Sequence, residues 1–371
     1  MMIQEPLPTV IPDPTSTDIL TPLPTETVTI TVTIESDTGP FDIVVSEPRR
    51  LEIPLCNEMP KFAPDGNRYI CSLGDLESRG LWLRSLDRGL ERLLTKKPGG
   101  TAAWSPDGRA IAYIERPDQT VHVEGGIVKF LDLESGQEIE AGITDFTYRL
   151  DFTPDGKLVY HRRGELRLFD PTLRSERAVP GVTVANNLPY YYSEFKFSPD
   201  GKRIAGLEVA YDQGVLTVVD IETGQRIKIS DQIGPPWGPF DWSPDGQQLA
   251  YSIVLEETRF PELWLVNADG SEPRRLCTTD QRGSYDFVTW LPNGKAILFV
   301  LMPGSGTDPI LWSAYQVISP LGGEPKTLFT GGASIQLVDQ GRQMVFYRFS
   351  DPQKGEPPGL GGDWVTFLSY Q

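Results

Sequence analysis

Short apolar stretches recur along the whole chain, and each one follows a tight turn. Residues 110–113 (AIAY), 248–251 (QLAY) and 296–300 (AILFV) are examples. Short, β-prone apolar runs bounded by turn residues are typical of buried strands. No stretch shows the longer period of a helix. The pattern therefore predicts an all-β protein.

The turns share one phrase: an aromatic residue, a small residue, then Pro-Asp-Gly. The phrase occurs seven times, and the seventh copy is worn. Its glycines are Gly66, Gly108, Gly156, Gly201, Gly246, Gly294 and Gly341, and successive glycines lie 42 to 48 residues apart. Proline sets the first corner of a type I turn, Asp tolerates the second, and glycine takes the left-handed position that closes a hairpin. A repeat of this length is typical of a four-stranded propeller blade.

A second hairpin follows the first in six repeats. In repeat five its strands are residues 263–266 and 274–276, and in repeat six they are residues 311–314 and 326–329. Four strands in each of seven repeats predict a seven-bladed β-propeller. Residues 364–368 provide a third strand for the last repeat, but no fourth strand follows them.

The missing strand has a candidate at the other end of the chain. Residues 47–51 (EPRRL) are identical to residues 272–276, the outer strand of repeat five. An open ring would expose a sheet edge that can pair with another chain. We therefore expect the N-terminal segment to supply the outer strand of the last blade and to close the ring.

The phrase aromatic-Ser-Pro-Asp-Gly, followed by an apolar strand, resembles the repeat of the TolB-type propeller family, a relative of WD repeats. The resemblance covers residues 47–371, with six of seven copies well kept. It implies a propeller. The family's namesake carries a separate α/β domain before six blades, so its role is not implied here. Related propellers also precede the hydrolase domain of prolyl-oligopeptidase-like peptidases or form polysaccharide lyases.

Residues 1–46 differ in composition from the repeats. They contain seven Pro, ten Thr, seven Asp or Glu and no Lys or Arg. Such a segment buries little apolar surface, which predicts a disordered acidic stalk or linker before a propeller at 47–371. Residues 27–34 do alternate like a strand and could add to a sheet edge. We expect a monomeric propeller.

The net charge of −17 disfavours nucleic acid and anionic membrane surfaces as partners. No apolar run is long enough to span a bilayer, so we expect no direct membrane insertion. Residues 1–6 lack the basic start and apolar stretch of a signal peptide. Pro/Thr-rich stalks before such propellers resemble those of exported or surface proteins of bacteria, so an extracytoplasmic location, periplasmic or cell-surface, is favoured over a cytoplasmic one.

The three cysteines leave two alternatives open. Cys56 and Cys71 flank the first hairpin closely enough for a disulfide, with Cys277 left over. Alternatively, all three are semi-buried thiols that act as small hydrophobic residues.

A search for catalytic motifs predicts no catalytic residues, no metal site and no cofactor. The sequence has no nucleophile elbow, no zinc motif and no phosphate-binding loop. It has two histidines, His122 and His161, and a lyase of this fold would use several around a metal. The Asp of each turn phrase has a structural role. A pair of carboxylates assembled from two blades remains an alternative.

Three consecutive connections between repeats are rich in aromatic residues, and we expect them on one face. The candidate ligand-binding residues are Tyr190, Tyr191, Tyr192, Trp237, Tyr285 and Asp286. Exposed Tyr and Trp mark interfaces and sugar- or peptide-binding surfaces. The leading hypothesis is a non-enzymatic scaffold that binds a protein, peptide or glycan there. The alternative is a propeller enzyme, a lyase or glycosidase with carboxylates at the channel mouth.

Overall fold

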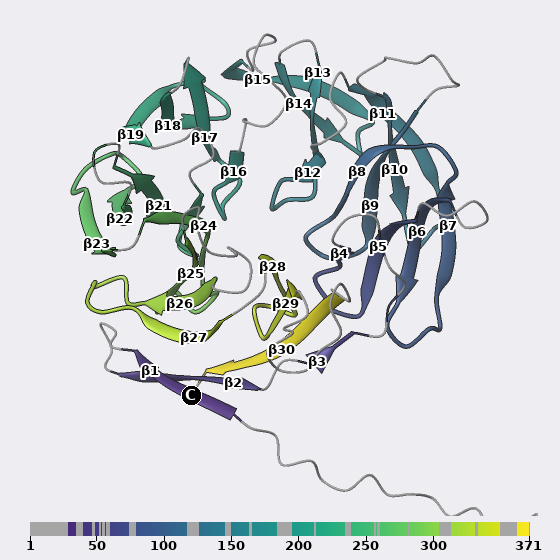
Figure 1. Ribbon diagram of the computed structural model, residues 1–371. Helices are drawn as coiled ribbons and strands as arrows, with labels where there is room; N and C mark the ends of the chain where they lie inside the picture. Colours follow the sequence, from purple (N-terminus) through teal and green to yellow (C-terminus); the bar gives the residue numbers. More distant parts are fainter. Residues whose placement is uncertain are drawn as a thin grey trace, which may run out of the picture.

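The computed structural model describes the chain in segments: 29–34, 40–46, 49–51, 53, 56, 60–73, 79–116, 126–144, 150–162, 165–183, 195–210, 213–233, 239–255, 257, 260–280, 282–303, 313–330, 333–348 and 362–370. Every strand pairing within them is antiparallel, and seven sheets stand around a common axis. The first strand of each blade lies nearest the axis and the fourth lies outermost (Figure 1). The predicted seven-bladed propeller is confirmed. The described residues include no helix able to cross a membrane.

Six blades are four-stranded sheets whose strands follow chain order. Blades one to three comprise β4 (Lys61–Phe62), β5 (Arg68–Leu73), β6 (Gly80–Ser85), β7 (Glu91–Thr95); β8 (Pro98–Trp104), β9 (Ala110–Glu115), β10 (Gly126–Asp132), β11 (Glu138–Thr144); and β12 (Leu150–Phe152), β13 (Leu158–Arg162), β14 (Glu165–Asp170), β15 (Ser175–Thr183). Blades four to six comprise β16 (Phe195–Phe197), β17 (Arg203–Ala210), β18 (Gln213–Asp220), β19 (Arg226–Ile233); β20 (Phe240–Trp242), β21 (Gln248–Val254), β22 (Pro261–Asn267), β23 (Arg274–Thr278); and β24 (Gly283–Trp290), β25 (Ile297–Pro303), β26 (Ala314–Ile318), β27 (Lys326–Thr330).

Blade seven is closed by the N-terminal segment. Its strands are β28 (Ala333–Val338), β29 (Gln343–Arg348) and β30 (Gly362–Tyr370), and β3 (Arg49–Arg50) and β2 (Phe41–Ser46) both pair with β30. β1 (Thr29–Ile34) pairs with β2. The predicted closing strand is confirmed. The folded part begins before residue 47, however, because β1 and β2 lie within the range expected to be a linker.

Side chains join blade seven to blade one as well. The amide of Gln336 accepts a hydrogen bond from the backbone N of Phe62 at 3.0 Å and donates one to its carbonyl oxygen at 2.8 Å. The backbone N of Asp339 donates to the carbonyl of Pro64 at 2.8 Å. A disulfide links Cys56 to Cys71 in β5. The seam of the ring is thus held by strand pairing, hydrogen bonds and a covalent bond.

The turn phrase works through its small residue as well as its glycine. In blade two the hydroxyl of Ser105 donates to Asp107 at 2.7 Å and accepts from the backbone N of Ala110 at 2.8 Å. The backbone N of Gly108 donates to the carbonyl of Ser105, and Gly108 has a φ of 68°, which favours glycine. The residues of the phrase are therefore used within their own hairpin.

These hydrogen bonds make the stability of the protein sensitive to acid. The hydroxyls of Ser105 and Ser198 hold the pKa values of Asp107 and Asp200 below the ordinary value of 3.8. A lowered folded-state pKa stabilises the fold above the unfolded pKa, and this contribution is lost as pH falls through the folded value. We expect the guanidinium unfolding midpoint to be level above about pH 5 and to fall between about pH 4 and pH 2.

The matched control is the double variant Ser105→Ala/Ser198→Ala. It should be less stable at neutral pH and should show a smaller loss on acidification. An unfolding midpoint that does not change with pH would contradict this role of the turn aspartates.

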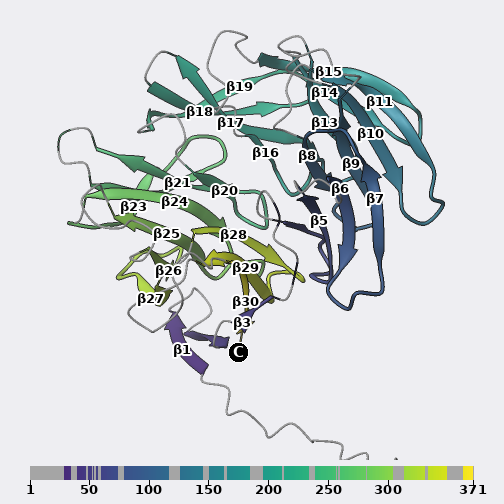
Figure 2. The same cartoon turned by 45° about the vertical axis from the view of Figure 1, so that its right-hand side comes forward.

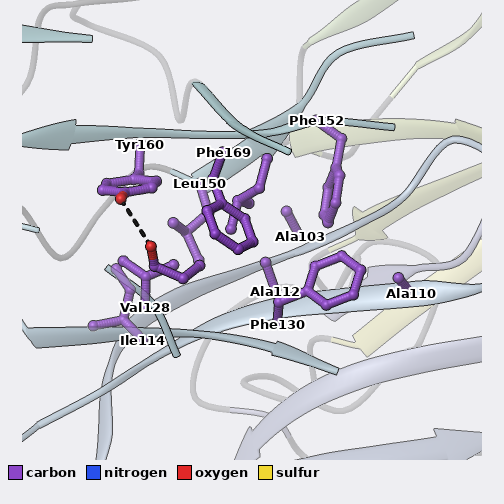
Figure 3. Packing of buried hydrophobic residues seen from close by; sticks show 12 residues of the cluster. Ala103, Ala110, Ala112, Ile114, Val128, Phe130, Leu150, Phe152, Tyr160 and Phe169 are labelled. Carbon is purple, nitrogen blue, oxygen red and sulfur yellow. Dashed lines mark hydrogen bonds between the residues drawn. The ribbon is translucent and has the colours of Figure 1, made fainter. Parts of the chain in front are cut away.

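Blades pack through small residues of one sheet against aromatic residues of the next. Between blades two and three, Ala103 and Ala112 lie in one buried cluster with Phe152 and Tyr160 (Figure 3). The hydroxyl of Tyr160 donates to the carbonyl of Ala141 at 3.2 Å, the dashed line in Figure 3. Each fully buried large apolar side chain contributes roughly 1.5–3 kcal/mol, so the inter-blade layers carry much of the stability.

At two of the junctions between blades, an arginine of one blade contacts the backbone and an aromatic ring of the next blade. In blade four, Nη2 of Arg203 donates to the carbonyl of Gly246 at 2.7 Å, and the guanidinium lies 5.1 Å from the ring centroid of Trp242. Nε1 of Trp242 donates back to blade four at 2.9 Å. The same set joins blades one and two, through Arg68, Trp104 and Gly108.

Replacing Arg203 with alanine should lower the free energy of unfolding by about 1–2 kcal/mol, because a hydrogen bond and a cation–π contact are lost together. Chemical denaturation measures the change. Arg109→Ala is the matched control, since Arg109 is 74% exposed and its nearest carboxylate oxygen is 4.0 Å away. It should change stability by no more than about 0.5 kcal/mol. Equal effects of the two variants would contradict the inter-blade role.

Candidate functional site

The connections of the propeller divide between two ends of the blades. Because neighbouring strands are antiparallel, the Pro-Asp-Gly turns and the turns between third and fourth strands share one end. The starts of first strands and the ends of fourth strands share the other, which we call the loop face. Tyr190, Tyr191 and Tyr192 fall in the connection from β15 to β16, and Trp237 falls in the connection from β19 to β20. All four lie outside the described residues, so their prediction as contacts stays a prediction.

Asp286 and Tyr285 lie in β24, near its start at the loop face. The pairing of β24 with β25 has a bulge between Tyr285 and Phe287, where Asp286 has no direct partner. Asp286 is exposed, and the hydroxyl of Ser284 donates to its carboxylate. The bulge turns Asp286 outward and leaves Tyr285 and Phe287 on the inner surfaces of the blade.

Tyr285 is a core residue, so its prediction as an exposed ligand contact is wrong. It is 1% exposed and packs edge to face with Phe299, with ring centroids 4.9 Å apart. Its hydroxyl lies 3.9 Å from Sγ of Cys277. Burial raises the pKa of Tyr285. The sequence indicated a loop at this point, whereas β24 already begins at Gly283.

A second group of polar residues lies on the innermost strands and was not singled out from the sequence. Nζ of Lys196 in β16 is 3.0 Å from Oδ1 of Asp241 in β20. Oδ2 of Asp241 accepts from Oγ1 of Thr289 at 2.7 Å and from the backbone N of Trp290 at 3.0 Å. The carboxylate of Asp241 therefore joins blades four, five and six.

These residues occupy one position of the repeat, directly before the aromatic residue or its equivalent. We call the seven residues at this position the axial set: Lys61, Ala103, Asp151, Lys196, Asp241, Thr289 and Gln336. Six of the seven are polar, a signal that an alignment of the repeats reveals. Gln336 bonds the backbone of Phe62 just as Asp241 bonds that of Trp290, so this position links neighbouring blades.

Other groups with potential chemistry are buried in the frame. His161 is 2% exposed, and its ring centroid lies 5.7 Å from that of Phe195 in the next blade. His122 lies outside the described residues. Burial raises the pKa of the Cys277 thiol to about 11, which disfavours the nucleophilic thiolate at neutral pH. In the described part of the chain, no three His, Cys, Asp or Glu side chains are grouped as metal ligands.

Comparison with known proteins supports the fold. No family model matches the chain. The uncharacterized peptidase YuxL of Bacillus subtilis (strain 168) is 26% identical over 212 residues, 54% of this chain. The chain matches 30% of the length of that relative.

Solved structures similar to this chain include the following two. The β-propeller domain of the Trilobed protease from Pyrococcus furiosus aligns with a TM-score of 0.56 and 14% identity, over 85% of this chain and 94% of that one. Oligogalacturonate lyase from Vibrio parahaemolyticus aligns with a TM-score of 0.53 and 18% identity, over 82% and 84% of the two chains. At these identities the likeness extends to the fold alone.

Proposed function

We propose that this propeller is a non-enzymatic binding module that recognises a protein, peptide or glycan through its loop face. The observation that carries the proposal is that polar side chains at the turn end of the blades form hydrogen bonds within their own turns. At the turn end, the carboxylates of Asp107, Asp200 and Asp245 accept hydrogen bonds from Ser hydroxyls of their own turns. These groups stabilise the hairpins. The connections at the loop face lack this repeated phrase, so their sequences can differ from blade to blade and can serve binding.

The frame beneath those connections is stiff. Hydrogen bonds from Arg203 and ion pairs such as Lys196–Asp241 join adjacent blades, and buried aromatic residues fill the layers between them. Contact residues held on such a frame lose little conformational entropy on binding. Binding loops on a rigid scaffold are a common arrangement in proteins. The aromatic connections with Tyr190 to Tyr192 and Trp237 are the proposed contact elements.

The proposed location is outside the cytoplasm. Disulfides such as Cys56–Cys71 form and persist in oxidising compartments and are rare in the cytosol. The charge of −17 favours partners without a large anionic surface. A protein, peptide or neutral or cationic glycan of the cell envelope fits both properties.

A catalytic role on carbohydrate is the second candidate, and the axial set bears on it. Asp151 and Asp241 occupy equivalent positions two blades apart, where a pair of carboxylates could act on a glycosidic bond. Both oxygens of Asp241, however, are engaged by Lys196 and by blade six. Catalysis by this pair requires those bonds to open, so the binding module is the better-supported function.

Capture of partners from the native cell envelope tests the proposal. The full chain is compared with the Tyr191→Ala/Tyr192→Ala/Trp237→Ala variant, and bound proteins and glycans are quantified. The control variant is Leu173→Ala/Leu321→Ala, which removes two exposed apolar side chains from turns at the opposite end of the blades. The proposal predicts a partner lost with the first variant and retained with the second. Equal capture by all three forms would contradict a working loop face.

A further inference from the structure

The outermost strand of blade seven differs from those of the other six blades in having no charged residue. Those of blades one to six each carry charged residues: Glu91 and Arg92, Glu138 and Glu140, Glu176 and Arg177, Arg226 and Lys228, Arg274 and Arg275, and Lys326. Charged side chains on an edge strand discourage pairing with another chain. The outermost strand of blade seven, β1, reads Thr-Ile-Thr-Val-Thr-Ile and carries no charge, no proline and no bulge. It is the unprotected edge of the ring.

The geometry of β1 leaves that edge available. It pairs with β2 over its full length, from Thr29 opposite Ser46 to Ile34 opposite Phe41. Within the described residues, β2 is the one strand hydrogen-bonded to it. Figures 1 and 2 both show β1 at the periphery, outside β30 and beside β27. Thr31 and Thr33 are exposed.

The chain's own upstream sequence is a poor partner for this edge. Residues 1–24 contain six prolines, at positions 6, 8, 12, 14, 22 and 24. Proline lacks the N–H that a ladder of backbone hydrogen bonds requires. Residues 1–24 are therefore not expected to pair with β1 over its length.

We propose that β1 pairs with β1 of a second copy of this chain, forming an antiparallel two-fold dimer. The sequence of β1 is complementary to itself, because its alternation places Thr opposite Thr and Ile or Val opposite Ile or Val in a register centred on residue 31 or 32. Such threonine and β-branched pairs across antiparallel strands are favourable. A two-fold interface requires this kind of self-complementary patch. The dimer joins two sheets into one through the peripheral strand and does not use the loop face.

The charges around β1 give the dimer a distinctive salt dependence. Glu26, Glu35 and Asp37 flank β1 in the sequence, and Asp42 of β2 lies opposite Thr33 and accepts a hydrogen bond from its hydroxyl. The nearest strand of another blade, β27, contributes Lys326, so acidic residues are in excess around β1. Two copies therefore repel each other near the interface, and salt screens this repulsion. Dimerisation should strengthen as salt rises, whereas pairing with a basic partner would weaken. A strand pair of this size is small for an interface, so a Kd of about 10–100 µM is expected.

The sequence led us to expect a monomer, and sedimentation equilibrium decides between the monomer and the proposed dimer. The full chain is measured from about 1 to 300 µM, at about 50 and 500 mM sodium chloride. We expect a reversible dimer that is tighter at the higher salt. A monomer under all conditions, or a dimer that salt weakens, would overturn the proposal.

Charge-swap variants test the register. Thr31→Lys places two lysines beside each other across the two-fold axis and should weaken the dimer about tenfold or more. Mixing it with Thr31→Glu should restore a heterodimer. Thr172→Lys makes the same charge change at an exposed turn of blade three and should leave the dimer intact. Thermal melts confirm that all variants are folded. A dimer that survives Thr31→Lys, or that Thr172→Lys disrupts equally, would place the interface elsewhere and overturn the proposal.

Discussion

Reduction of the Cys56–Cys71 disulfide is expected to lower the free energy of unfolding by about 3 kcal/mol, the effect of a cross-link that closes a loop of this size. The two cysteines are 15 residues apart in sequence. Cys71 is buried in β5, and Leu51, Ile53 and Cys56 pack on the same cluster as Phe62. The bond therefore ties the segment after the closing strand β3 to blade one. Its loss should loosen the seam at which the ring closes.

Denaturation with and without a reductant measures this effect. The Cys56→Ala/Cys71→Ala variant should be as unstable as the reduced protein and should not respond to reductant. Cys277→Ala serves as the control: it should respond like the unaltered chain. Thiol titration of the denatured, unreduced protein should detect one of its three cysteines. Detection of three thiols, or the same free energy of unfolding with and without reductant, would contradict a stabilising Cys56–Cys71 disulfide.

Gly142→Ala should lower the free energy of unfolding by about 2–3 kcal/mol, although it adds a single methyl group. Gly142 lies in β11, and a Cβ at this position would collide with the hydroxyl oxygen of Tyr160 in blade three. Tyr160 is fully buried and cannot move aside without breaking the packing in Figure 3. The backbone of Gly142 is not left-handed, so the cost is steric and not conformational.

A double-mutant cycle isolates this contact. Tyr160→Phe alone loses the hydrogen bond to Ala141 and should cost about 1 kcal/mol. Because it also removes the nearest of the Tyr160 atoms that the new methyl group meets, and leaves Cζ at 2.7 Å, the clash is partly relieved. The double variant should therefore be more stable, by about 1 kcal/mol, than the sum of the single effects predicts. Additive effects would show that the blades adapt to the methyl group in another way.

The repeat allowed much of the frame to be predicted, because each turn phrase determines a hairpin locally. The serine, aspartate and glycine of blade two satisfy one another within a few residues, so their spacing was enough. The residues at which individual strands begin and end were harder to predict. The third strand of blade six was expected at residues 311–314, whereas β26 spans Ala314–Ile318. In β26, buried Tyr315 and Val317 alternate with more exposed residues. The apolar pair Leu311-Trp312 just before β26 made this alternation hard to recognise in the sequence.

Local pattern also outweighed composition at the N-terminus. Residues 1–46 are rich in Pro, Thr and acids on average, yet Ile43 and Val45 of β2 are almost fully buried in a cluster made mainly by residues of blade six. At the candidate site, a bulge in β24 leaves Tyr285 buried and Asp286 exposed. A bulge depends on the partner strand as well as on the sequence around it, so the sequence alone did not predict it. The links made by the axial set were missed because each joins residues of different blades.

Site-specific photo-crosslinking in living cells tests whether the loop face is the binding surface of the propeller. Benzoylphenylalanine is placed at Tyr191 or Trp237 on the loop face, or at Leu173 or Leu321 at the opposite end. We expect a partner to crosslink to positions 191 and 237 and not to positions 173 and 321. Crosslinks confined to positions 173 and 321 would contradict it.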